Sequence, residues 1–460
     1  MSRVLDQIIF LSLLLIIALS AIPYGTVEPW WEALFECSIF ALGILWVLEG
    51  WLSRTWHVRG SGLLLPLLAL AIFSFLQTLF WGTASATIVA GVRSDAWRAI
   101  SADPYGTRLF VYKLLAVILT VELLLRYTYS RRRLSLLLNV VIGIATASAL
   151  FGIYRERAPG SATGSILPLV LPGVGYGEFI NRNHFAFLME MALGLVIGLV
   201  VARGLPRARV LIYLVASVPI WMALVLTDSR GGFMSMIGEL GFTILLLGAV
   251  YQARKSKAQA AGIWAWFRRA SSSLFIRVVL IAGLALAVVI GSVWLGGDPL
   301  VNRLETVRSE LRPDALDSRL RVRRLEIWRA TWHLIKDHPV AGVGFGGYWA
   351  ALPEYYDSSG GWTVREAHND YMELLASGGI IGAGLGLWFG FSFLKRASKQ
   401  LQSLDPFRRA ACYGAAVGLF GIACHSLVDF GLHITVNSLV CIALIVVATV
   451  DLGGPETQSI

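Results

Sequence analysis

The sequence predicts an all-α integral membrane protein with about twelve transmembrane helices and one large, partly helical loop outside the bilayer. Three observations predict this fold class. Of the 460 residues, 56% are hydrophobic and only 15% are charged, whereas about a quarter of the residues in an average soluble domain are charged. Apolar runs close to the roughly 20 residues that a membrane helix needs recur along the chain. Basic residues gather in alternate connections between these runs.

The apolar runs define the predicted transmembrane helices and divide the chain into three parts. The runs lie at about 7–22, 33–52, 63–81, 109–126, 134–153, 184–202, 210–227, 231–250, 277–295, 376–394, 410–428 and 434–451. We interpret the first run as a span and not a cleaved signal peptide, because further spans follow it. The predicted parts are residues 1–295 with helices 1–9, the loop 296–375, and residues 376–460 with helices 10–12.

Charge in the connections predicts the orientation. The connections 53–62, 126–133, 203–209, 252–276 and 395–409 are rich in Arg and Lys and contain one acid, Asp405. Because short cytoplasmic loops carry such an excess, both termini are expected in the cytoplasm and the loop 296–375 in the periplasm. This pattern, together with contact to anionic lipid headgroups, accounts for the net charge of +10. Nucleic-acid binding is therefore not expected.

The large loop contains an arginine cluster followed by a helical pattern. The arginines are Arg319, Arg321, Arg323 and Arg324. A helix is predicted from about 315 to 336, with Leu325, Trp328, Trp332 and Ile335 forming one apolar stripe. Guanidinium groups hold phosphate oxygens in a fixed geometry and stay charged. The cluster is therefore a candidate phosphate site, and the alternative is a face that binds solvent or lipid headgroups.

Two further polar clusters lie where predicted spans meet the outer surface. Arg230 stands in the hairpin 227–232 beside two glycines, which predicts either a ligand contact or an arginine that reaches the membrane interface. Asn181, Asn183 and His184 open the sixth span with side chains suited to hydroxyl and phosphate contacts. A helix cap at Asn183 is the alternative for that cluster.

The segment 367–379 places a histidine and two acids where polar chain meets an apolar run. His368 is followed by Asn369, Asp370 and Glu373. Histidine, with an unperturbed pKa of about 6.5, is the side chain best suited to accept a proton near neutrality. On a helix, His368 would share one face with Tyr371 and Leu375, and Asn369 another face with Glu373. We therefore predict His368 as a general base.

The last polar cluster lies at the end of span eleven. Asp429 and His433 would share a helix face, but Gly431 indicates a break between them. We expect these residues to support the architecture of the site.

The sequence lacks the signatures of several other chemistries. It contains no GxSxG, DxD or HExxH, so no metal or cofactor site is expected. The glycine-rich stretch 342–347 lacks the Lys-Ser/Thr that ends a phosphate loop. The acids inside predicted spans, Glu49, Glu122, Glu190 and Glu239, are expected mostly at span ends or in pairs. Two matching halves, typical of many transporters, are not visible.

Five segments together resemble the O-antigen ligase family, which includes O-antigen polymerases and protein O-oligosaccharyltransferases. They are NRNHFAF at 181–187, DSRGGF at 228–233, RRLEIWRATWHLIKDHPVAGVGFG at 323–346, AHNDYMELLASGGIIG at 367–382 and HSLVDFGLHI at 425–434. The resemblance covers about 180–435. It implies a bacterial inner-membrane bundle with a large periplasmic loop, similar to the C-class lipid-linked-sugar glycosyltransferases. It also implies that Arg230 and Arg324 bind pyrophosphate and that His368 activates the acceptor.

The resemblance implies transfer of a glycan from undecaprenyl pyrophosphate to an acceptor hydroxyl, in surface polysaccharide synthesis. We expect a metal-independent inverting displacement with no cofactor, in contact with membrane lipids. Asn181, Asn183, His184, Arg319, Arg321, Arg323, Asn369, Asp370 and Glu373 are the expected substrate-binding residues. The acceptor is a glycan such as lipid A–core in a ligase, or the growing chain in a polymerase. A protein acceptor, and in a different class a transporter of polyprenyl-linked glycans or solutes, are the alternatives.

Overall fold

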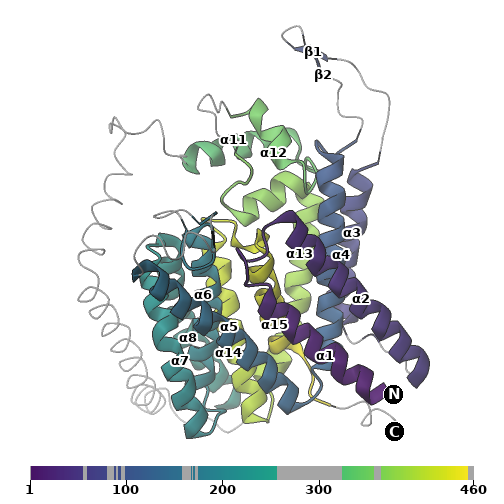
Figure 1. The fold of residues 1–460 in the computed structure, drawn as a ribbon. Helices are drawn as coiled ribbons and strands as arrows, with labels where there is room; N and C mark the ends of the chain where they lie inside the picture. The colour runs from purple at the N-terminus through teal and green to yellow at the C-terminus, as the bar shows by residue number, and fades with distance from the viewer. Residues whose placement is uncertain are drawn as a thin grey trace.

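A computed structural model describes most of the chain (Figure 1). The described residues are 2–54, 58, 60–79, 87–89, 92–94, 99–157, 167, 169–170, 175–255, 324–356 and 364–453. The predicted span 277–295 lies outside them, as do Arg319, Arg321 and Arg323.

Helices build the described structure. They are α1 (Ser2–Leu19), α2 (Pro29–Ser53), α3 (Ser61–Gln77), α4 (Pro104–Tyr127), α5 (Arg131–Arg157), α6 (Arg182–Val201), α7 (Arg207–Leu226), α8 (Arg230–Lys255), α11 (Arg324–Asp337), α12 (Tyr348–Ala351), α13 (Asp370–Leu401), α14 (Pro406–His425) and α15 (Thr435–Thr449), with 3₁₀ turns η1 (Leu352–Glu354) and η2 (Gly431–His433). A short antiparallel hairpin, β1 (Thr87–Val89) with β2 (Val92–Ser94), was not predicted.

A helix covers every predicted span except 277–295, which lies outside the described residues. Six described helices, α2, α5, α6, α7, α8 and α13, are long and apolar enough to cross a membrane. Two more, α3 and α15, are apolar but shorter. The chain is therefore a multi-pass membrane protein, and the total of about twelve spans stays a prediction.

Helices α6 and α14 form the centre of the bundle and pack at very short distance. A Cβ atom built on Gly198 would lie 2.3 Å from the Cα atom of Gly414, and one on Gly194 would lie 2.6 Å from that of Gly418. Small residues permit such contact between membrane helices, where lipid removes the hydrophobic drive for association. This contact fixes the start of α6 beside the end of α14, where the polar motifs lie.

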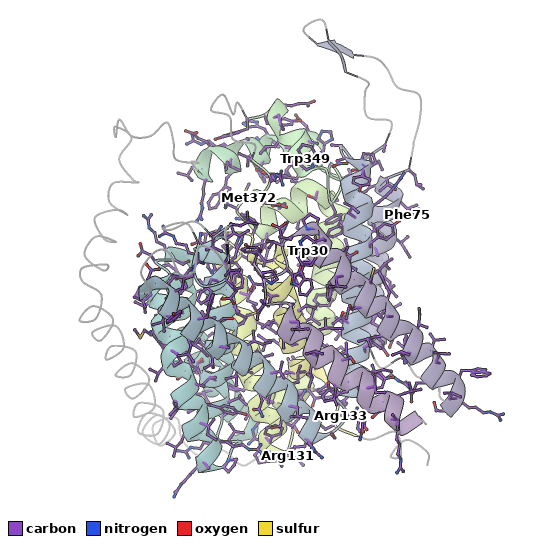
Figure 2. The ribbon with its side chains drawn as sticks, in the orientation of Figure 1. Trp30, Phe75, Arg131, Arg133, Trp349 and Met372 are labelled. Carbon is purple, nitrogen blue, oxygen red and sulfur yellow. The ribbon has the colours of Figure 1, made fainter. Side chains whose placement is uncertain are left out.

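The two ends of the bundle differ in what they contain. Ion pairs join Asp6 to Arg133 and Arg131 to Asp405, so the starts of α1 and α14 lie at the same end as the start of α5. Figure 2 shows Arg131 and Arg133 at this end and Trp349 at the opposite end. The polar motifs lie toward the end with Trp349, and which end faces the periplasm stays a prediction.

The described part of the large loop is helical and docks on a break in α13. At Gly379 the backbone leaves the helix with φ +59°, a left-handed value that glycine adopts readily. A Cβ atom there would lie 2.3 Å from the carbonyl oxygen of Val340. The backbone N–H groups of Val343 and Gly344 donate to the carbonyls of Ala376 and Ser377, which ties the glycine-rich turn to the first part of α13.

The predicted apolar stripe of the loop helix is wrong at Leu325 and Trp332, whereas Ile335 is buried as predicted. Leu325 is 64% exposed and Trp332 is 50% exposed, although α11 ends at Asp337 as predicted. The buried face instead contains Ile327, Ala330, Thr331, Leu334 and Ile335. The buried face is therefore rotated around the helix from the predicted stripe and shares Ile335 with it.

The acids inside the predicted spans mostly have partners, as expected. Glu49 pairs with Arg126 at 3.1 Å. Glu122 accepts the backbone N–H of Gly60, at 2.9 Å. Glu190 lies 2.7 Å from a ring nitrogen of His425. The two carboxyl oxygens of Glu239 are buried and have no hydrogen-bond partner among the described residues.

Candidate active site

Asp429 is the centre of the candidate site. It lies in the connection between α14 and η2, and its side chain is fully buried. One carboxylate oxygen, Oδ2, accepts hydrogen bonds from Asn183 Nδ2 at 2.6 Å and Arg324 Nη2 at 3.0 Å. The other, Oδ1, accepts from the backbone N–H of Phe430 at 3.0 Å and lies 3.2 Å from His368 Nδ1. Three segments distant in sequence, with Asn183, Arg324 and His368, therefore meet on the carboxylate of Asp429.

The partners of Asp429 keep it ionised. Burial alone would raise the pKa of this carboxyl, but the hydrogen bond from His368 and the charge of Arg324 hold it well below its ordinary value. An ionised carboxylate only accepts hydrogen bonds, so Nδ1 of His368 carries the proton that lies between them. Nε2 is then the nitrogen of His368 that can accept a proton from another molecule.

The backbone around His368 has a conformation that the sequence did not predict. His368 precedes α13 in a left-handed conformation with φ +51°, so the predicted helix face with Tyr371 and Leu375 does not form. Asn369 caps the helix, because its Oδ1 accepts the backbone N–H groups of Tyr371 and Met372. Its Nδ2 donates to the carbonyl of Leu427. Both polar ends of Asn369 thus hold the segment in place.

Two further contacts fix the residue before the histidine. The backbone N–H of Ala367 donates to Glu373 Oε2 at 2.8 Å. The carbonyl of Ala367 accepts the indole N–H of Trp328 at 3.0 Å. Helix α11 therefore supports the histidine segment through Trp328, while Arg324 at its start reaches Asp429.

The side chains of Arg324 and His368 are each bound to Asp429 and are also partly exposed to solvent. The side chain of Arg324 is 39% exposed and that of His368 is 25% exposed, although both contact the fully buried Asp429. Each side chain therefore has one part held by protein and another part open to a ligand. This arrangement suits residues that act on a substrate from a fixed position.

The start of α6 contributes one hydrogen-bond donor to Asp429 and one helix cap. Asn181, and not Asn183, caps the helix, because Asn181 Oδ1 accepts the backbone N–H of Asn183 at 2.8 Å. The alternative role for Asn183 as a cap is therefore wrong, and its side chain is available to bind Asp429. The ring of His184 is buried and meets the ring of Phe430 edge to face, with centroids 4.7 Å apart.

Arg230 begins α8 and is partly exposed. The next residue, Gly231, packs so closely on His425 that a Cβ atom there would lie 2.2 Å from His425 Nε2. His425 is the last residue of α14, four positions before Asp429. The structure thus brings Arg324 and His368 together on Asp429 and links Arg230 to them through the contact of Gly231 with His425.

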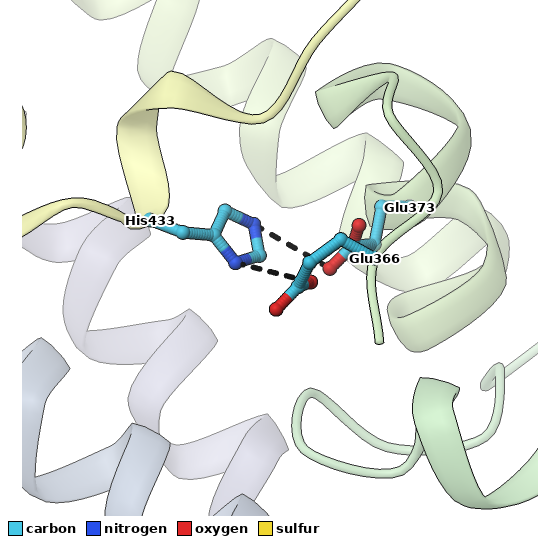
Figure 3. A group of neighbouring side chains, drawn as sticks. All are labelled: Glu366, Glu373 and His433. Carbon is cyan, nitrogen blue, oxygen red and sulfur yellow. Dashed lines mark ion pairs between the residues drawn. The ribbon is translucent and has the colours of Figure 1, made fainter. Parts of the chain in front are cut away.

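A second polar cluster lies on the other side of Phe430, whose ring meets those of both His368 and His433 edge to face. Glu366, Glu373 and His433 offer ligand atoms that all lie within 4.8 Å of one another, a group that could hold a metal ion (Figure 3). Both ring nitrogens of His433 face carboxylates in this arrangement.

Sequence reasoning underrated Asp429, His433 and Glu366. The motif HSLVDFGLHI contains the first two and was assigned to architecture, since their spacing along the chain says nothing about contacts with residues 61 to 246 positions away. The signal that could have identified Asp429 is an acid that directly follows a membrane helix, which needs a partner when buried.

The fold and the site define a multi-pass membrane protein that has a His–Asp–Arg cluster at one end of its helix bundle. A model of the O-antigen ligase family matches residues 215–389, which include Arg230, Arg324 and His368. This match supports the resemblance to the O-antigen ligase family over the matched segment. No curated protein matches the chain. The family implies a glycosyltransferase-like enzyme of surface polysaccharide synthesis that acts on lipid-linked glycan and polysaccharide acceptors.

Proposed function

We propose that the protein transfers a glycan from an undecaprenyl-pyrophosphate donor to an acceptor hydroxyl at the periplasmic face of the bacterial inner membrane. The observation that supports this most is the shared carboxylate of Asp429, which holds a histidine base and a phosphate-binding arginine side by side. One group suits the acceptor and the other suits the leaving pyrophosphate. A transporter does not require such a pair.

The proposed reaction is a single inverting displacement. The acceptor oxygen attacks the anomeric carbon while its proton moves to Nε2 of His368. The bond from the anomeric carbon to the pyrophosphate oxygen breaks, and its electrons leave with the lipid pyrophosphate. Asp429, bound to the opposite nitrogen, stabilises the positive imidazolium that forms, as the aspartate does in a Ser-His-Asp triad.

The arginines offset the charge that develops on the leaving group. Arg324 is held by Asp429 and remains 39% exposed, so it can bind a phosphate oxygen without losing its anchor. Arg230, and Arg319, Arg321 and Arg323 beyond the described residues, are the further cations proposed for the pyrophosphate. Fixed guanidinium groups supply the positive charge in this mechanism, so the proposal includes no metal ion.

The test compares His368→Ala with His333→Ala, a change at an exposed histidine on α11. Both proteins are purified, placed in lipid nanodiscs and supplied with a lipid-linked oligosaccharide and candidate acceptors. We expect the first variant to bind donor and transfer little glycan, because no base accepts the hydroxyl proton, and the second to act like wild type. Full transfer by His368→Ala would remove the proposed base.

The acceptor defines which member of the family this is. Addition of one preformed block to lipid A–core would indicate a ligase, a ladder of products a polymerase, and a labelled protein an oligosaccharyltransferase. Product size in the same assay separates these outcomes.

A further inference from the structure

His433 lies between two carboxylates that flank the histidine segment (Figure 3). Its Nδ1 is 3.3 Å from Glu366 Oε2, and its Nε2 is 3.4 Å from Glu373 Oε1. Glu366 stands two residues before His368, and Glu373 stands in the first turn of α13. One ring therefore contacts both sides of the segment that contains the proposed base.

Carboxylates beside both ring nitrogens favour the charged form of the ring. A neutral imidazole has one N–H donor, whereas an imidazolium has two and can serve both carboxylates. Burial alone would lower the pKa of His433, but Glu366 and Glu373 raise it to about 10. Burial likewise would raise the pKa of Glu366, but His433 lowers it to about 2. The ring is 41% exposed, so water screens part of this attraction.

The contacts of Glu373 and His433 transmit this attraction to His368. The Glu373 carboxylate that pairs with His433 also accepts the backbone N–H of Ala367, the neighbour of His368. The backbone of His433 is bound to the helix bundle, because its carbonyl accepts a hydrogen bond from Lys113 Nζ of α4 at 3.0 Å. Lys113 in turn pairs with Glu32 of α2. A chain of ion pairs and hydrogen bonds thus runs from the bundle to the backbone beside the proposed base.

We propose that His433 is a positioning residue whose imidazolium clamps Glu366 to Glu373 and thereby fixes where His368 presents Nε2 to the acceptor. This inference rests on the proposed function, in which His368 is the base. His433 itself has no role in bond making or breaking. We call the three residues Glu366, Glu373 and His433 the clamp.

The same three side chains could instead bind a metal ion, so the experiment must distinguish a metal-free imidazolium from a neutral ring bound to a metal. A metal ligand uses the lone pair of a neutral ring nitrogen. In the structure both nitrogens face carboxylates at distances suited to charged contacts. Asp370 Oδ1, 3.7 Å from Nε2, adds a third carboxylate that favours the imidazolium.

The kinetic test compares His433→Gln with the matched control His333→Gln in the nanodisc transfer assay. A displacement of about 1 Å at a catalytic group can cost about 10²-fold, so we expect kcat of the first variant to fall by about that factor. Its KM for donor should stay within about twofold, because the arginines that bind the donor are unchanged. Adding Glu366→Gln to the variant removes one of the three carboxylates left without the imidazolium, and should restore part of kcat.

The stability test uses pH. The groups facing His433 are Glu366, Glu373, Asp370, Lys113 and, across Phe430, His368. A raised histidine pKa gives stability that is complete below the ordinary value of 6.5 and is lost as pH rises toward 10. The lowered pKa of Glu366 gives stability above its ordinary 4.5. The melting temperature of wild type should therefore exceed that of His433→Gln most between about pH 4.5 and 6.5, and the difference should shrink by pH 10.

Each other outcome overturns the clamp. Wild-type kcat in folded His433→Gln, or a change confined to donor KM, would show that His433 does not position the base. A melting temperature that divalent cations raise in wild type but not in His433→Gln would show a metal site instead. Full transfer by His368→Ala in the same assay would overturn the proposed function, while the pH dependence of melting would still report on the clamp.

Discussion

Asp429→Asn removes one charge and replaces one acceptor oxygen with an NH2 donor at the centre of the site, while nearly keeping the shape of the side chain. The native carboxylate accepts from Arg324 at 3.0 Å and contacts His368 at 3.2 Å, in a place where no part of it is exposed. An asparagine has one acceptor oxygen for these partners. Whichever way the side chain turns, its NH2 group faces a hydrogen-bond donor of Arg324, Asn183 or His368 and cannot accept from it.

The expected loss follows from the two charged contacts. A hydrogen bond to a charged group contributes about 1.5–3 kcal/mol, so the contacts to His368 and Arg324 together account for about 3–6 kcal/mol. Arg324 is 39% exposed and partly screened, which favours the lower end. A loss of about 3 kcal/mol expressed in the transition state lowers the rate about 10²-fold. The upper bound is the about 10⁴-fold loss caused by the matching change in a Ser-His-Asp triad.

The assay measures kcat and donor KM for glycan transfer by the purified variant in nanodiscs, beside its melting temperature. Asp405→Asn is the matched control, since Asp405 caps α14 at the other end of that helix and asparagine caps equally well. We expect the control to keep wild-type transfer. The expected loss is about 10²-fold. If Asp429→Asn is folded and its kcat stays within about threefold of wild type, the reasoning from the shared carboxylate is refuted.

Two further changes test the parts around this centre. Gly231→Ala places a Cβ atom 2.2 Å from the buried ring of His425, so we expect a melting temperature lowered by overpacking worth about 1–3 kcal/mol, while Gly241→Ala on the same helix, with open space at its Cβ, should not lower it. Arg324→Lys keeps the positive charge but loses the planar guanidinium, which can donate two parallel hydrogen bonds to a phosphate. We therefore expect its transfer rate to lie about tenfold below that of wild type and above that of Arg324→Ala. Equal transfer by the Lys and Ala variants would contradict a role for the charge of this residue.

The helices were predictable because a bilayer imposes a length on apolar runs. Each predicted span among the described residues contains a helix, and the described arginine-rich connections 126–133, 203–209 and 395–409 fall at the end opposite the site. The break after α14 was also predictable, since Gly431 stands between Asp429 and His433 and only a 3₁₀ turn forms there. These features depend on local sequence, where length, glycine and charge act directly.

The sequence singled out Asn183, Arg324 and His368 but did not predict that all three contact the carboxylate of Asp429. His368 was assigned to a helix, but its φ of +51° depends on Asn369 bonding to Leu427, a residue 58 positions away. The alternative interpretation placed the helix cap at Asn183, but Asn181 caps the helix and the side chain of Asn183 donates to Asp429. Long-range partners decided each of these outcomes, and a single sequence contains no direct record of them.

The shared carboxylate explains why one buried residue can govern both halves of the proposed reaction. Asp429 holds Arg324 through Oδ2 and His368 through Oδ1, so any shift of its backbone moves the phosphate ligand and the base together. Its own position is fixed by the close contact of α6 with α14, through Gly194 and Gly418. His433, by contrast, acts on the histidine segment alone. Substitution at Asp429 should therefore change kcat and donor KM together, whereas substitution at His433 should change kcat and leave donor KM as it is, and this difference separates the shared anchor from the clamp.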